Sequence, residues 1–198
     1  MRALTTLLAA AVITVGLAGS PATAAPSTTT DIRLITFNDF HGNLQPPAGS
    51  SGRVTLPDGT TVDAGGAAYL ATHLRNLRSQ VRNSVVFSAG DNVGASPLDS
   101  ALFHDEPTMD VLNKLGVAAS VVGNHEFDEG YRELRRMTRG GCLPDGDGAN
   151  NQNSCPDAAN PFAGADWPYL AANVKFENTG RPILPPYKIR KVKGQKVA

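Results

Sequence analysis

The sequence has 198 residues, of which 41% are hydrophobic and 18% are charged, enough for one domain with a hydrophobic core. Basic and acidic residues are equal in number, with 18 of each. This balance argues against the strongly basic proteins that bind nucleic acids or acidic membranes, so we expect no nucleic-acid polymer as a partner.

The N-terminus has the pattern of a secretory signal peptide. Arg2 supplies a positive charge, residues 3–17 are almost wholly apolar, and Ala22-Thr23-Ala24 matches a small-x-small cleavage site. We therefore expect residues 1–24 to be removed and residues 25–30 to form a linker. The mature protein would then be secreted or lie in the cell envelope without membrane insertion. An uncleaved anchor is the alternative, although about fifteen apolar residues are short for a membrane span.

The spacing of apolar residues predicts an alternation of strands and helices. In chain order we expect a strand at 32–37, a surface hairpin from 53–56 and 60–62, a helix at 67–82, a strand at 84–89, a helix at 108–115, a strand at 117–122, a helix at 131–139, and strands at 167–174 and 187–191. The final residues, Val197 and Ala198, resemble the start of another strand. The β-α-β-α-β order predicts an α/β fold with parallel strands and right-handed crossovers.

Helical spacing also indicates which residues face the core. We expect the buried side of two helices to consist of Leu70, Leu74, Leu77, Val81, Met109, Leu112 and Leu115. Gly116 is expected to end the helix at 108–115 as a C-cap glycine. His73 is interpreted as a structural or surface residue.

Cys142 and Cys155 are the only cysteines in the sequence. In an oxidising compartment we expect them to form a disulfide, which would contribute about 3 kcal/mol in the chain-entropy model. The alternative is a metal site with two thiolate ligands, which is disfavoured because no histidine or further cysteine lies nearby. The segment beginning at Asp145 faintly resembles a calcium loop, but no glutamate closes it.

Three successive predicted strands end in residues that can bind metal ions. Asp39 and His41 follow the first strand, Asp91 follows the second, and Asn124 and His125 follow the third. The carboxyl ends of neighbouring parallel strands lie side by side, so these groups should converge. Carboxylate, amide and imidazole ligands suit divalent metals, and a carboxylate on the middle strand can bridge two ions.

His125 and Asp128 are three residues apart, so a helix-like turn would place them on one side. A carboxylate fixes the tautomer of an imidazole and favours its protonated form, which can protonate a leaving alkoxide. Taken singly, these residues have ordinary interpretations as helix caps, turn residues or hydrogen-bonded structural groups. Their joint occurrence at three strand ends favours a metal site, with Glu126 and Phe127 as scaffold.

These segments together resemble the first three signature blocks of a known family. Asp39-Phe40-His41-Gly42, Gly90-Asp91-Asn92 and the stretch 123–128 are similar to those of the calcineurin-like metallophosphoesterases, and more narrowly to those of the secreted 5′-nucleotidases. The stretches 34–42, 94–98 and 170–174 also fit this branch. The resemblance implies that residues 31–198 form a partial calcineurin-like domain, the first β-α-β-α-β half of a four-layer α/β/β/α sandwich.

The resemblance also implies a role for each matched residue. Asp39 and His41 would bind one divalent ion, Asp91 would bridge two ions, and Asn124 would bind the second. His125 and Asp128 would form the catalytic pair. The two ions, which could be Mn, Zn, Fe, Mg or Co, would activate water to dephosphorylate a nucleotide. The same fold also implies alternative substrates: UDP-sugars, cyclic nucleotides or thiosulfate esters.

One departure from the family pattern is equally important. The family takes further metal ligands from two later histidine-containing blocks, but this sequence has no histidine after His125, and His73 and His104 match neither block. The family's separate C-terminal nucleotide-binding domain is also absent. We therefore expect a truncated chain that binds metal weakly and is poorly active. The alternative is a secreted, non-catalytic binding protein that retains a degenerate half-domain.

Overall fold

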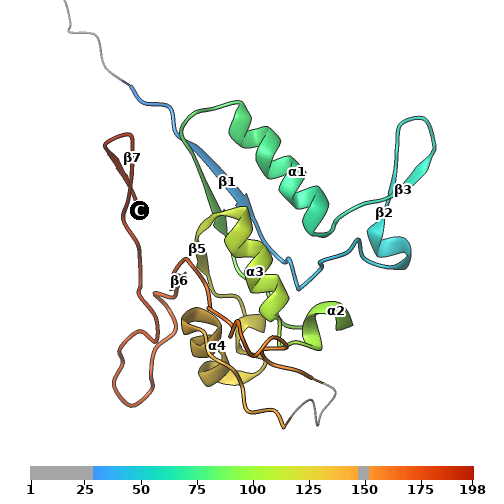
Figure 1. Ribbon diagram of the computed structural model, residues 1–198. Coiled ribbons are helices and arrows are strands. Elements are labelled where there is room, and N and C mark those ends of the chain that lie inside the picture. Colours follow the sequence, from blue (N-terminus) through green and yellow to red (C-terminus); the bar gives the residue numbers. More distant parts are fainter. Residues whose placement is uncertain (1–28, 147–151) are drawn as a thin grey trace, which may run out of the picture.

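The computed structural model describes residues 29–146 and 152–198 (Figure 1). The predicted signal peptide, 1–24, and most of the predicted linker, 25–30, lie outside the described residues. Within the described ranges, no helix combines the length and the apolar character that a membrane crossing requires.

A four-stranded parallel sheet forms the centre of the molecule. Its strands, in spatial order, are β1 (Arg33–Phe37), β4 (Ser84–Ser88), β5 (Val117–Val121) and the short β6 (Tyr169–Leu170). Each neighbouring pair is parallel. The predicted β-α-β-α-β order and the parallel α/β fold are thereby confirmed.

The helices connect these strands and shape the edge at which the strands end (Figure 1). They are η1 (Gly49–Gly52), α1 (Gly66–Ser79), α2 (Leu98–Ala101), α3 (Glu106–Leu115), η2 (His125–Phe127) and α4 (Gly130–Arg139). Gly116 ends α3 with a φ of 67°, a left-handed conformation that glycine adopts without steric cost, as the sequence predicts.

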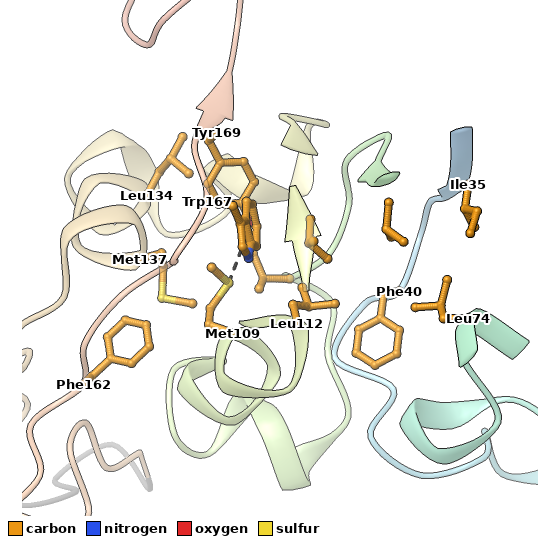
Figure 2. Packing of buried hydrophobic residues seen from close by; sticks show 13 residues of the cluster. Ile35, Phe40, Leu74, Met109, Leu112, Leu134, Met137, Phe162, Trp167 and Tyr169 are labelled. Atoms are coloured by element: carbon orange, nitrogen blue, oxygen red, sulfur yellow. Dashed lines mark hydrogen bonds between the residues drawn. The ribbon is translucent and has the colours of Figure 1, made fainter. Parts of the chain in front are cut away.

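The core lies where α3 meets the sheet and the segment that leads into β6. Met109 and Leu112 of α3 are fully buried and lie beside Trp167 and Tyr169 (Figure 2). The Tyr169 hydroxyl donates a hydrogen bond to the Met109 sulfur at 3.9 Å. Leu134 of α4, 1% exposed, extends the same core toward the end of β5. The core therefore fixes α3 and α4 relative to the strand ends.

The apolar side of α1 is narrower than predicted. Leu74 is 2% exposed and Leu70 packs against the core, but Leu77 is 37% exposed. The last turn of α1 is held instead by Arg33 of β1, whose guanidinium donates to the Leu77 carbonyl at 3.1 Å and to the Gln80 side chain at 2.7 Å. Polar contacts at the edge of the sheet thus take the place of the expected burial of Leu77.

The predicted strands of the C-terminal segment differ from the structure in extent. The strand expected at 167–174 is reduced to β6, beyond which the Ala171 amide donates to the Pro185 carbonyl. The strand expected at 187–191 is β7 (Arg190–Val192), and it pairs with β8 (Gln195–Val197) in a separate antiparallel hairpin. The surface hairpin β2 (Arg53–Thr55) and β3 (Thr61–Asp63) is confirmed.

The two faces of the sheet differ in how they are covered. Ile35 and Val86 point into the core, whereas Leu34 on the other face is 55% exposed. A cavity of about 540 Å³ lies on this second face, bounded by the sheet and by residues 186–190 and 197–198. A sheet with one covered and one open apolar face agrees with the expected half of a sandwich.

Candidate active site

The ends of β1 and β4 bring three predicted metal ligands together, and we call Asp39, His41 and Asp91 the strand-end cluster. One carboxylate or imidazole atom from each lies within 4.8 Å of the others. The backbone hydrogen bonds continue past the strands, because the Asp39 amide donates to the Gly90 carbonyl and the His41 amide donates to the Asp91 carbonyl. The parallel pairing of β1 and β4 therefore sets the register of the cluster.

All three residues of the strand-end cluster have left-handed backbone conformations. The φ angles are 52° for Asp39, 45° for His41 and 53° for Asp91. Such angles are uncommon for residues other than glycine, although aspartate and histidine tolerate them better than most. Conformations of this kind gather at functional sites, where the surrounding structure holds them in place.

The orientation of His41 leaves one ring nitrogen for a ligand. Nδ1 lies 2.8 Å from the Gly94 carbonyl, and a carbonyl can only accept, so Nδ1 carries the proton. In a neutral ring Nε2 then has a free lone pair, and it faces Asp39 Oδ1 at 3.7 Å. An imidazole that donates through one nitrogen to a backbone carbonyl and offers the other is typical of metal sites.

The end of β5 closes the site from the other side. The His125 amide donates to Asp91 Oδ1 at 3.0 Å, and the exposed Asn124 directly precedes it as the N-cap of η2. A Cβ atom at Gly123 would lie 2.1 Å from Asp91 Oδ1, so only glycine allows the Asp91 carboxylate to approach this turn. The structure thus places all three predicted strand ends at one edge of the sheet.

His125 and Asp128 form the predicted pair. His125 Nδ1 lies 2.7 Å from Asp128 Oδ2, and this hydrogen bond is the main reason that the pKa of His125 is raised above its ordinary value of 6.5. The His125 ring also meets the His41 ring edge-on, with 4.8 Å between the ring centres. Nε2 of His125 therefore remains available to hold a proton beside the strand-end cluster.

Glu126, which the sequence predicts to be scaffold, holds the backbone of two strand ends at this site. Its side chain is buried, and its two carboxylate oxygens accept the backbone amides of Asp91 at 2.9 Å, Asn92 at 2.8 Å and Gly123 at 2.6 Å. Residues from two strand ends thus share one carboxylate. Its position between the predicted ligand Asn124 and Asp128 was visible in the sequence, but its partners were not.

A second group of possible metal ligands was missed by the sequence analysis. We call His104, Glu129 and Glu133 the helix cluster, because Glu129 and Glu133 lie at the start of α4; their candidate ligand atoms lie within 4.8 Å of one another. His104 is 5% exposed, whereas His73 is exposed on α1. No motif marks His104, and its burial is visible only in the tertiary structure.

The predicted disulfide joins Cys142 to Cys155, with 5.5 Å between their Cα atoms. It pins the segment that carries Asp145 onto the helices, where the Cys155 amide donates to Glu106 at 2.7 Å. A cavity of about 110 Å³ is lined by the helix cluster, His104, Glu129 and Glu133, and by His125 and Asp128. The helix cluster and the His125–Asp128 pair therefore face one space.

The comparisons with known proteins agree with this arrangement. An uncharacterized protein from the pqq-V 5′ region of Acinetobacter calcoaceticus is 40% identical over 80% of this chain and 78% of its own length. Endonuclease YhcR of Bacillus subtilis is 35% identical over 88% of this chain but only 13% of its own length. A 2′,3′-cyclic-nucleotide 2′-phosphodiesterase/3′-nucleotidase of Salmonella typhimurium is 26% identical over 82% of this chain and 21% of its own.

Among solved structures, the NAD nucleotidase of Haemophilus influenzae matches with a TM-score of 0.59 and 26% identity. The match covers 83% of this chain and 25% of the nucleotidase, so the chain spans about a quarter of that protein. The family model described as calcineurin-like phosphoesterase matches residues 32–194, which include the strand-end cluster and the His125–Asp128 pair. The chain therefore belongs to the calcineurin-like phosphoesterase family, whose members hydrolyse phosphoesters.

Proposed function

We propose that this protein is a secreted, metal-dependent phosphoester hydrolase that acts on nucleotides. The observation that carries the proposal is the convergence of Asp39, His41 and Asp91 within 4.8 Å, directly beside the His125–Asp128 hydrogen bond. The ligand types fit divalent transition metals, since imidazole nitrogen and carboxylate oxygen both bind them. The orientation of His41 fits as well, because its free Nε2 faces the cluster.

Each residue contributes a distinct part of the proposed chemistry. Asp39 and His41 would hold one ion, Asp91 would be shared between two, and Asn124 would contribute an amide oxygen to the second. Divalent ions in such a site act as Lewis acids toward a phosphoryl oxygen and make water nucleophilic at neutral pH. Asp128 orients His125 and favours its protonated form, so His125 Nε2–H can give its proton to the leaving alkoxide.

Nucleotides are the proposed substrates because two of the similar proteins are named as nucleotidases. The name of the Bacillus relative leaves phosphodiesters in a polymer as a second candidate class. Either substrate offers a phosphoryl group to the same strand ends. Secretion is proposed from the signal-peptide pattern of residues 1–24, and a relative from Listeria monocytogenes is named a cell wall protein.

The test measures phosphate release from AMP and UMP, hydrolysis of a UDP-sugar to UMP and a sugar phosphate, opening of a 2′,3′-cyclic nucleotide to a nucleoside monophosphate, and cleavage of single-stranded DNA. Mn²⁺, Zn²⁺ or Mg²⁺ is added after chelation. We expect metal-dependent release of phosphate from a mononucleotide. The variants Asp39→Asn and His125→Ala should reduce this release.

Three outcomes distinguish the candidates. Hydrolysis of mononucleotides that depends on added metal and on His125 supports the proposal. Cleavage of DNA alone would replace it with the second candidate. Metal binding to a folded protein without hydrolysis of any of these substrates would contradict it and favour a non-catalytic binding protein.

A further inference from the structure

We propose that the helix cluster of His104, Glu129 and Glu133 binds its own divalent transition-metal ion, separate from the strand-end cluster. The three side chains come from two places, the loop after α2 and the first turn of α4, yet their candidate ligand atoms lie within 4.8 Å of one another. Ligands on one metal ion are mutually separated by roughly 3–4 Å when each lies about 2.1 Å from it, so small movements suffice. This inference does not depend on the proposed phosphoesterase activity.

The surroundings of the His104 ring point to a bound cation. Nδ1 lies 3.3 Å from Glu129 Oε2 and Nε2 lies 3.2 Å from Asp145 Oδ2, so each ring nitrogen faces a carboxylate. A neutral imidazole has one N–H and can satisfy only one of these two acceptors. The other nitrogen needs a positive charge between itself and its carboxylate. A metal ion on Nδ1, with Nε2–H donated to Asp145, gives the carboxylate–histidine–metal arrangement found in many metal sites.

Glu133 is held in the way that a ligating carboxylate commonly is. The Arg136 guanidinium donates to both of its oxygens, at 2.6 to 3.0 Å, and donates to Glu106 at 2.6 Å. Burial lowers the pKa of Arg136, but the hydrogen bonds and charges of Glu133 and Glu106 outweigh it, and the pKa is raised overall. A carboxylate has about four lone pairs, so Glu133 can accept from Arg136 and still bind an ion.

The balance of charge favours a divalent ion over a proton. Four carboxylates meet here, those of Glu106, Glu129, Glu133 and Asp145, and Arg136 is the guanidinium that pairs with two of them. A proton on His104 adds one positive charge, whereas a divalent ion adds two beside Glu129 and Glu133. The side chains of Glu133 and Asp145 are both only 11% exposed, so water screens them poorly. An imidazole ligand favours Zn²⁺ over Ca²⁺ or Mg²⁺.

The position of the helix cluster indicates a structural role for the ion. Glu129 directly follows Asp128, so an ion on Glu129 fixes the turn that holds the catalytic pair. Asp145 lies within the disulfide-closed segment, and the Ser154 amide donates to it at 2.7 Å. The ion would therefore join the disulfide segment, α4 and the loop after α2. The cavity of about 110 Å³ shared with His125 gives it a path from solvent.

The test counts the Zn²⁺ bound to the purified protein after chelation and equilibrium dialysis against ZnCl₂, with elemental analysis as the readout. Asp39→Asn serves as the background that weakens the strand-end cluster. We expect this background to retain one tightly bound Zn²⁺ per chain, which His104→Gln removes. Glu129→Gln should weaken binding at least about tenfold, as expected for loss of one ligand. Asp110→Asn, the same charge change on the exposed face of α3, should have no effect.

NMR of the His104 ring gives a second readout, the protonation of its two ring nitrogens. This protonation would not respond to Zn²⁺ if His104 only supported the fold. In the Zn²⁺-loaded protein we expect a neutral ring with its proton on Nε2. Zn²⁺ counts that are unaffected by both Glu129→Gln and a folded His104→Gln would overturn the proposal. A doubly protonated ring at every Zn²⁺ concentration would also overturn it, in favour of a proton shared between carboxylates. If His104→Gln does not fold, Glu129→Gln decides, because the Glu129 side chain is 47% exposed and its replacement disturbs no core.

Discussion

The strand-end cluster and the helix cluster are similar in composition but differ in how the fold builds them. Asp39 and Asp91 follow adjacent parallel strands, and the ladder between β1 and β4 alone brings them together. His104 and Glu133 are brought together by the packing of α3 and α4 and by the disulfide segment. Burial differs as well: the Asp39 side chain is 54% exposed, whereas that of His104 is 4% exposed.

This difference separates two kinds of site. A cluster at the ends of parallel strands is open to substrate, and its residue types and spacing can be recognised in the sequence. A cluster among packed helices is largely buried, and its charges must be balanced where they lie. We therefore propose a catalytic role for the strand-end cluster and a structural role for the helix cluster. Four experiments test this division of roles, in order of decreasing expected effect.

Replacing Asp91 should have the largest effect, because this carboxylate is the proposed bridge between two ions. In Asp91→Asn we expect phosphate release to fall by at least about 100-fold, more than is usual for loss of a supporting contact. The Zn²⁺ held by the helix cluster should remain. Asp110→Asn is the matched control. Activity within twofold of the unmodified protein would remove Asp91 from the proposed mechanism.

Replacing Glu126 should destabilise the strand ends without removing a proposed ligand. In the unmodified protein, three backbone N–H groups donate to the carboxylate oxygens of Glu126. Glu126→Gln replaces one of these oxygens with an amide NH₂ group, which cannot accept. We therefore expect a loss of about 3 kcal/mol in the free energy of unfolding. Urea denaturation measures this loss. Glu177→Gln, at an exposed position, is the control. Equal stability of the two variants would show that the buried carboxylate is dispensable.

Removing the disulfide should affect the helix cluster more than the strand-end cluster. In the double variant Cys142→Ser, Cys155→Ser we expect a loss of about 2–3 kcal/mol in the free energy of unfolding. We also expect weaker Zn²⁺ binding at the helix cluster, because Asp145 is then less firmly held against His104. Dialysis in the Asp39→Asn background measures this binding. A larger loss of metal from the strand-end cluster than from the helix cluster would contradict the proposed division of roles between the two clusters.

Replacing Asp128 should leave the fold intact and change a titration. In the metal-free protein, Asp128→Asn should lower the pKa of His125 toward its ordinary 6.5, because the hydrogen bond that His125 donates to Asp128 is the largest cause of its elevation. With the folded pKa raised, this pairing stabilises the protein fully below about pH 6.5, and the contribution is lost as pH rises through the folded pKa. NMR titration measures the pKa of His125 in the unmodified protein and in Asp128→Asn. Identical titration curves would contradict the pairing of His125 with Asp128.

Much of the fold could be predicted from the sequence where local pattern and tertiary packing agree. The strands that end before Asp39, Asp91 and Asn124 are short runs rich in β-branched and apolar residues, and Gly116 marks the end of α3 correctly. The bounds predicted for the strands at 167–174 and 187–191 were wrong, because apolar character does not determine where a strand finds a partner. The Trp167 side chain is buried in the core, and β7 finds its partner in β8 rather than in the sheet.

The sequence by itself determined the family, the parallel order of the strands and the residues at the strand ends. It could do so because those residues lie next to regular elements whose geometry is fixed by the backbone. Only the tertiary structure showed the three amides shared by Glu126 and the carboxylates on both sides of His104. Apart from the Gly123 amide, which lies three residues from Glu126, those contacts join residues that are 25 to 41 positions apart in the chain. Side-chain packing alone brings such segments together, and no local pattern encodes it.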